Sequence, residues 1–252
     1  MNRVDALFKR LKREKRCGLI AYVTCGDGDT VQIVEELEQA GADAIELGIP
    51  FSDPIADGPV IQAASMRALA KGTTTRDVFA IARAIRSRSE IPLIAFSYLN
   101  PVLRYGATAF ARDAKASGVD SLLLTDLPPE SAAELRTAMH AEELGTVFLL
   151  APTSTDTRIR AIDKASDGFV YYVSTTGVTG TRSDLDPALL TRLDEVRSKL
   201  KHPIAVGFGI SRHEHYEMLR HRCDAIVVGS AIVRAIANGE SAGAVVRGIL
   251  GK

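Results

Sequence analysis

The sequence has 252 residues, of which 46% are hydrophobic and 25% are charged, as in an ordinary globular protein. Its 31 Lys and Arg residues balance 31 Asp and Glu residues, which argues against nucleic acid or an anionic membrane surface as the main partner. There is no apolar run of the roughly 18 residues that a membrane span needs, no recognisable secretory signal and no CxxC pair among the three cysteines, so we expect a cytoplasmic protein without a disulfide framework.

The chain begins with a run of basic residues at positions 9, 10, 12, 13, 15 and 16. A solvated helix face, with Leu7, Phe8 and Leu11 packed beneath it, accounts for this run. An anion or RNA patch is the alternative, but the neutral total charge provides no wider basic field. We therefore expect an N-terminal helix.

Eight short apolar runs follow, and each has the length of a strand covered on both faces. They span residues 18–25, 43–49, 91–98, 120–126, 146–152, 169–175, 203–210 and 225–231. Helical patterns lie between them, including residues 30–40, 75–86, 107–116, 131–143, 187–200 and 211–220. Gly41 and Gly118 follow two of these patterns as helix-ending glycines, and Asp186 before Pro187 is typical of a helix start.

The alternation of strands and helices predicts an α/β fold, a (β/α)8 TIM barrel that forms one domain over residues 1–252. An open doubly wound sheet is the alternative, but the turn after its first strand would be acidic here, at residues 26–29. The connections 50–72 and 176–186 are long and loop-like, and such loops are usually functional. In these barrels the chemistry lies at the C-terminal ends of the strands.

Glu46 is the first candidate catalytic residue. Strand alternation places Ala44, Glu46 and Gly48 on one side and the larger Ile45 and Leu47 on the other. The large apolar side should face the helices, so Glu46 should point into the barrel. No Lys or Arg lies in the predicted strands to neutralise it, so burial should raise its pKa toward the range of a general acid. A structural Glu with other donors is the alternative.

Asp57 follows on the long loop after this strand, and by its position alone it could equally build a turn before Gly58 and Pro59. A buried carboxylate and a loop carboxylate together would form a plausible acid and base pair. Glycines also cluster at the ends of the last three strands, at 177–180, 207–209 and 229. Their backbone N–H groups, with Thr179 or Ser230, could hold a phosphate, which predicts a phosphorylated small substrate.

Two other features are weaker. His213, His215 and His221 lie in or near one predicted helix, but His213 and His215 are two residues apart and point to different faces, so a metal site is not expected. Cys25 ends the first strand without a nearby base, so we interpret it as a packing residue.

The sequence resembles the tryptophan synthase α subunit family over nearly its full length. The most specific match is residues 45–62, IELGIPFSDPIADGPVIQ, and supporting matches are YLNP at 98–101, DLP at 126–128, GVTG at 177–180, GFGI at 207–210 and VGSA at 228–231. The resemblance implies a lyase that cleaves indole-3-glycerol phosphate to indole and glyceraldehyde 3-phosphate. It implies no cofactor in this chain, and a β subunit that carries pyridoxal phosphate and joins it in an α2β2 complex.

The resemblance also implies residue roles. Glu46 would be the acid and base, and Asp57 would bind the indole N–H and stabilise positive charge on the ring. Residues matching positions that line the indole pocket are Tyr22, Ile61, Tyr98 and Phe208, with Tyr171 nearby. Residues matching the phosphate site are Gly180, Phe208, Gly209, Gly229 and Ser230. Thr179 would contact the catalytic Asp from a mobile loop.

Two positions depart from the family pattern: Gly28 stands where relatives usually have proline, and Cys25 where they have a small residue. Three other functions remain open on the residues alone. They are a free-standing lyase that needs no partner, a non-catalytic activator of the β subunit, and another phosphate-binding barrel enzyme. Glu46 and Asp57 argue against the activator, and the lack of a Lys inside a strand argues against the other barrel enzymes.

Overall fold

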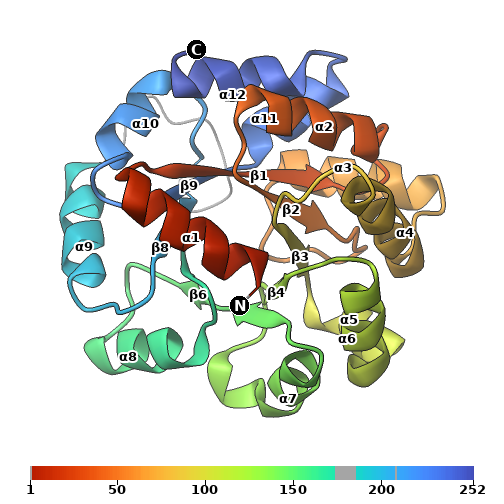
Figure 1. Ribbon diagram of the computed structural model, residues 1–252, viewed down its shortest axis with the longest axis horizontal. Coiled ribbons are helices and arrows are strands. Elements are labelled where there is room, and N and C mark those ends of the chain that lie inside the picture. Colours follow the sequence, from red (N-terminus) through yellow and green to blue (C-terminus); the bar gives the residue numbers. More distant parts are fainter. Residues whose placement is uncertain (1, 174–185, 208) are drawn as a thin grey trace.

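A computed structural model describes residues 2–173, 186–207 and 209–252, which form a ring of parallel strands surrounded by helices (Figure 1). The strands are β1 (Gly18–Thr24), β2 (Ala44–Gly48), β3 (Leu93–Ser97), β4 (Ser121–Leu124), β5 (Gly145–Val147), β6 (Leu149–Leu150), β7 (Val170–Val173), β8 (Ile204–Gly207) and β9 (Ala225–Val228). Their order is β5-β4-β3-β2-β1-β9-β8-β7-β6. Because β5 and β6 are two pieces of one expected strand, interrupted at Phe148, this order closes the predicted eight-stranded barrel.

The helices confirm most of the predicted pattern. They are α1 (Arg3–Glu14), α2 (Thr30–Ala40), α3 (Pro59–Ala70), α4 (Thr75–Arg86), α5 (Leu99–Tyr105), α6 (Ala107–Ala116), α7 (Ala133–Ala141), α8 (Asp156–Ala165), α9 (Pro187–Arg197), α10 (His213–Leu219), α11 (Ser230–Ala237) and α12 (Ala242–Leu250), with a 3-10 turn at Pro129–Ser131. Within the described part of the chain, no helix is long and apolar enough to cross a membrane.

The prediction of a continuous loop over residues 50–72 is wrong, because α3 occupies its second half. The turn-like Gly58 and Pro59 are the start of this helix, with Gly58 as its N-cap and Pro59 in its first turn. The loop proper therefore ends next to Asp57, and a helix follows it directly.

The core has two layers, as the alternation in β2 predicts. Ile45 and Leu47 pack outward into the cluster that includes the helices. The inward side chains near the N-terminal ends of the strands form a second cluster, which includes Val4, Leu7, Phe8 and Leu11 of α1. Figure 1 shows α1 lying across the end of the barrel, within the ring of the other helices. Its basic residues are mostly solvent-exposed, which confirms the helix-face interpretation of the basic run.

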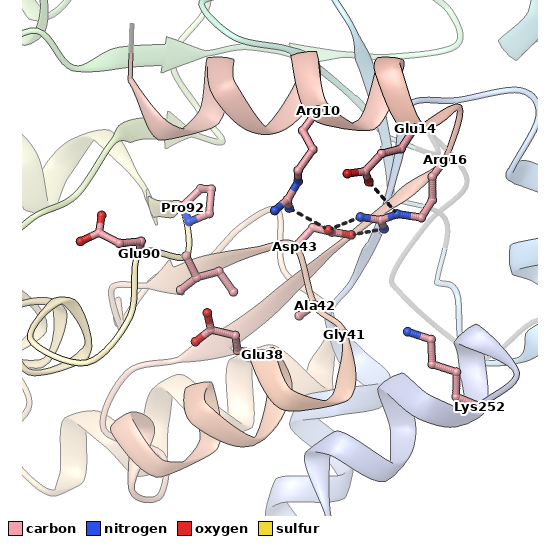
Figure 2. Close-up of a pocket in the computed structure, with 11 residues that line it drawn as sticks. Arg10, Glu14, Arg16, Glu38, Gly41, Ala42, Asp43, Glu90, Pro92 and Lys252 are labelled. Carbon is pink, nitrogen blue, oxygen red and sulfur yellow. Dashed lines mark hydrogen bonds and ion pairs between the residues drawn. The ribbon is translucent and has the colours of Figure 1, made fainter.

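Four aspartates fasten neighbouring strands at this same end of the barrel. Asp43, Asp120, Asp167 and Asp224 each accept a hydrogen bond from a backbone N–H of the preceding strand, namely that of Leu19, Leu93, Thr146 and Ile204. Each aspartate also donates its own N–H to the carbonyl of that same residue. Arg16 binds Asp43 through two nitrogens at 2.7 Å and Arg10 adds a third contact at 3.2 Å (Figure 2). The aspartates thus satisfy backbone groups at the strand starts.

Candidate active site

Glu46 lies inside the barrel, as the alternation predicts. Its neighbours in register are Tyr22 on β1 and Ile94 on β3. The side chain is 0% exposed, and neither carboxylate oxygen has a hydrogen-bond partner among the described residues. Burial raises the pKa of Glu46 to about 8, so the group is mostly protonated at neutral pH. A buried, proton-carrying acid without a structural partner is available for chemistry.

Asp57 stands on the loop between β2 and α3. Burial raises the pKa of Asp57 to about 6, and a hydrogen bond from the Tyr98 hydroxyl opposes this rise. The same hydroxyl accepts a hydrogen bond from the N–H of Ala56 at 2.9 Å. Gln62 of α3 donates its side-chain amide to the carbonyl of Asp57 at 2.8 Å. The loop is therefore held from both sides, and Asp57 is mostly ionised at neutral pH.

Tyr22 and Tyr171 lie near both carboxylates. Burial, and then the negative charges of groups that include Asp57 and Glu46, raise the pKa of both tyrosines well above the usual value. Each hydroxyl occupies space that a glycine leaves open on a neighbouring strand. A Cβ atom on Gly48 would lie 2.2 Å from the Tyr22 hydroxyl oxygen, and one on Gly207 would lie 2.7 Å from that of Tyr171. The glycines thus make room for two phenols at the barrel mouth.

The structure describes some of the remaining predicted site residues but not all of them. Ile61 of α3 packs in one small cluster with Tyr22. Gly229 follows β9 directly, and Ser230 begins α11. Gly209 follows β8 with a φ of 66°, a left-handed conformation that favours glycine. Thr179, Gly180 and Phe208 lie outside the described residues, as does nearly all of the predicted loop 176–186.

The structure shows the surroundings of Cys25 and of two of the histidines. Cys25 is fully buried, and burial raises the pKa of its thiol, which suits a packing residue. His213 and His215 contact a backbone carbonyl and the Arg212 side chain respectively. Within the described ranges there is no group of His, Cys, Asp and Glu side chains that could hold a metal ion.

Comparison with known proteins gives the family. The family model described as "Tryptophan synthase alpha chain" matches residues 8–248. The chain belongs to the tryptophan synthase alpha chain family. A tryptophan synthase alpha chain from Solibacter usitatus is 54% identical over 246 residues, covering 96% of this chain and 92% of its own length. One from Citrifermentans bemidjiense is 47% identical over 237 residues, with 93% and 89% covered.

Solved structures show the same fold. The tryptophan synthase alpha subunit from Legionella pneumophila superposes with a TM-score of 0.91 at 34% identity, covering 99% of this chain and 97% of its own. A chain from the tryptophan synthase a2b2 complex of Pyrococcus furiosus superposes with a TM-score of 0.88 at 40% identity, with 93% and 98% covered. Membership of this tryptophan synthase family makes the chain a lyase of tryptophan biosynthesis.

The roles of some residues in this chain emerge only from the three-dimensional structure. Gln62 lies in the family motif, but nothing in the sequence reveals that its side chain holds the backbone of Asp57. Gly48 and Gly207 read as strand and turn glycines, whereas their spatial role is to admit Tyr22 and Tyr171. Gly28 has a φ of 96°, which proline cannot adopt, so a proline at this position would require a different conformation of the turn.

Proposed function

We propose that this chain cleaves indole-3-glycerol phosphate to indole and glyceraldehyde 3-phosphate by acid and base catalysis. The observation that carries the proposal is Glu46, a fully buried acid without a hydrogen-bond partner among the described residues and with its pKa raised to about 8. Asp57 complements it, because its lower pKa of about 6 leaves it ionised when Glu46 is protonated.

The reaction then follows from these two protonation states. Glu46 gives its proton to C3 of the indole ring. The Asp57 carboxylate accepts a hydrogen bond from the ring N–H and stabilises the positive charge that develops on the ring. The bond from indole C3 to the glycerol chain breaks, and its electron pair restores the aromatic ring. The hydroxyl on the departing carbon becomes the aldehyde and loses its proton to Glu46, which returns the acid to its starting state.

The other predicted residues would bind and orient the substrate. Tyr22, Ile61, Tyr98 and Phe208 would line the indole pocket, with Tyr171 next to Glu46. The phosphate would be held by Gly180, Phe208, Gly209, Gly229 and Ser230, so that binding energy remote from the reacting carbons fixes their position. Thr179 would contact Asp57 when a substrate is bound.

We further propose that the chain works with a tryptophan synthase β subunit in an α2β2 complex. The a2b2 complex of Pyrococcus furiosus, whose chain superposes on this one, supports this partnership. The β subunit would carry pyridoxal phosphate and consume the indole, while this chain uses only its own side chains. Residues 50–53, in the same loop as Asp57, would contribute to the contact.

The deciding experiment is indole release from indole-3-glycerol phosphate by the purified chain, alone and with a β subunit. Weak release alone and strong release with the partner would support the proposal. Strong release that is indifferent to the partner would favour a free-standing lyase. No release in either case, with the chain folded, would refute the cleavage reaction.

The residue roles need their own variants. Glu46→Gln should fold and lose indole release, since the amide keeps the shape and removes the proton donor. Asp57→Asn should fold and lose most of the rate. Normal turnover in either variant would remove that residue from the proposed mechanism.

Gly229→Val should raise KM more than it lowers kcat, because Gly229 is assigned to phosphate binding and not to the chemical step. An unchanged KM would take Gly229 out of the phosphate site.

A further inference from the structure

We propose that Arg67 and Asp27, which lie outside the substrate site, form a positioning pair that fixes Asp57 through helix α3. The inference rests on the proposed role of Asp57 in catalysis. It concerns a connection between two loops at the barrel mouth, the β1–α2 loop that contains Asp27 and the β2–α3 loop that contains Asp57.

The pair itself is a bidentate ion pair. Arg67 Nε donates to one carboxylate oxygen of Asp27 at 2.8 Å, and Nη2 donates to the other at 2.6 Å. Asp27 is buried, whereas Arg67 reaches it from the partly exposed side of α3. Two parallel hydrogen bonds fix orientation as well as distance, which a single contact from a lysine would not do.

The β1–α2 loop is a firm support for this contact. The N–H of Cys25 donates to the carbonyl of Gly48 on β2 at 3.0 Å, and the N–H of Asp27 donates to the carbonyl of Thr24 at 3.2 Å. Gly26 lies so close to Thr73, which follows α3, that a Cβ atom there would come within 2.1 Å of the threonine oxygen. The loop is thus tied to the barrel and seated against the end of α3.

Helix α3 carries this constraint to Asp57. The helix begins at Pro59, two residues after Asp57, and Arg67 lies in its last turn. Between them, Gln62 donates to the carbonyl of Asp57 at 2.8 Å. Because a helix of this length moves as a rigid body, releasing its far end from Asp27 lets it rotate and shifts the loop held by Gln62. Asp57 contacts the reacting ring, so a shift of about 1 Å would affect the rate strongly.

The test is steady-state cleavage of indole-3-glycerol phosphate by Arg67→Leu and Arg67→Lys in the complex with the β subunit. We expect kcat to fall about tenfold while KM changes less than about twofold, because the phosphate anchor lies on other strands. We also expect the acidic limb of the kcat/KM profile to move to lower pH. The limb reports Asp57, which interacts with Tyr98, Tyr22 and Tyr171, and a loosened loop exposes its carboxylate to water.

Arg88→Leu is the matched control. Arg88 pairs with Glu35 at 2.6 Å on the outer surface, and its removal should leave kcat and the pH limb unchanged. Asp27→Asn should reproduce the effect of Arg67→Leu, and the double variant should be no worse than either alone, because both act through one contact.

The outcomes separate the two proposals. Unchanged kcat and an unmoved pH limb in both Arg67 variants would overturn the positioning role, even if their melting temperatures fall. Additive losses in the double variant would also overturn it. If Arg67→Leu fails to fold, Arg67→Lys and Asp27→Asn carry the test. Full activity in Asp57→Asn would instead refute the catalytic role on which the inference rests.

Discussion

The protonation states of Glu46 and Asp57 set the pH range of the proposed reaction. Cleavage needs Glu46 protonated and Asp57 ionised, and their pKa values are about 8 and about 6. We therefore expect a bell-shaped profile of kcat/KM, with an acidic limb near the pKa of Asp57 and a basic limb near that of Glu46. Initial rates of indole release between pH 5 and pH 9 would measure both limbs.

The assignment of the acidic limb can be checked with a variant. Asp57→Asn should lower the rate and remove the acidic limb, while the basic limb stays in place. Retention of both limbs in this variant would mean that another group is responsible for the acidic one.

Burial of Glu46 also predicts a pH-dependent cost to stability. Its pKa rises from 4.5 to about 8 on folding, so the folded state holds this proton more tightly than the unfolded state does. The stability associated with the proton is complete below pH 4.5 and is lost as the pH rises through 8. Glu46→Gln stays neutral, so between pH 4.5 and pH 8 its stability relative to the original chain should rise by about 5 kcal/mol. Urea unfolding of both chains at several pH values would measure this difference in the free energy of unfolding. A difference that stays constant with pH would contradict the prediction.

The two carboxylates were accessible from the sequence to different degrees. Strand alternation alone placed Glu46 inside the barrel, because side-chain direction in a strand follows a fixed period. Asp57 lies on a loop, which has no period, so residue spacing left it equally well explained as a turn. Its role came from the family resemblance, and the contact from Gln62 that holds it depends on the packing of a helix.

Helix α1 acts as the closure of one barrel end. Phe8 is buried and its ring lies 5.2 Å from that of Phe169, which belongs to the same inner cluster. Phe8→Ala should lower the free energy of unfolding by about 3 to 5 kcal/mol, because it leaves a cavity in that cluster. The exposed Lys12 on the same helix is the control, and Lys12→Ala should change the free energy of unfolding by about 0.5 kcal/mol or less. Chemical denaturation would compare the two variants, and equal losses of stability would contradict the closure role.

Helices with a strong apolar periodicity were predicted well, whereas elements without a clear periodicity were not. Residues 30–40 and 107–116 have clear apolar stripes and are followed by glycine at position 41 and, after Ser117, at position 118, and the structure has α2 and α6 over the same residues. Helix α3 buries small residues such as Ala64 and Ala68, which give little amphipathic contrast, and so it resembled a loop. The break between β5 and β6 at Phe148 depends on how the barrel closes, and no local signal marks it.

Across the whole molecule, the residues that stabilise the fold and the residues assigned to the chemistry lie at opposite ends of the barrel. The four aspartates and α1 lie at the N-terminal ends of the strands, whereas Asp57, Gly229 and Ser230 lie beyond the C-terminal ends. This division is general in parallel barrels, where loops after the strands vary and the opposite end is kept for structure. Substitutions at the aspartates should therefore change stability without changing the reaction.

The four aspartates differ in exposure, and this difference predicts a gradient of effects. The side chains of Asp43 and Asp120 are 7% and 3% exposed, whereas those of Asp167 and Asp224 are 34% and 30% exposed. Replacement by alanine leaves a backbone N–H without its acceptor in every case, and at Asp43 it also removes the bidentate partner of Arg16, which keeps only its contact with Glu14 at 3.5 Å. Asp43→Ala and Asp120→Ala should cost about 2 to 3 kcal/mol, because the backbone N–H groups that lose their acceptor belong to the fully buried Leu19 and Leu93.

At Asp167 and Asp224, water can replace part of the lost contact, so alanine there should cost about 1 to 2 kcal/mol. All four variants should keep the kcat/KM of the original chain at temperatures where they are folded. Chemical denaturation and indole release, measured on the same preparations, would test both statements. Equal stability losses at the four positions would contradict the role of burial. A fall in kcat/KM would show instead that the two ends of the barrel are coupled, because the aspartates touch none of the groups assigned to the reaction.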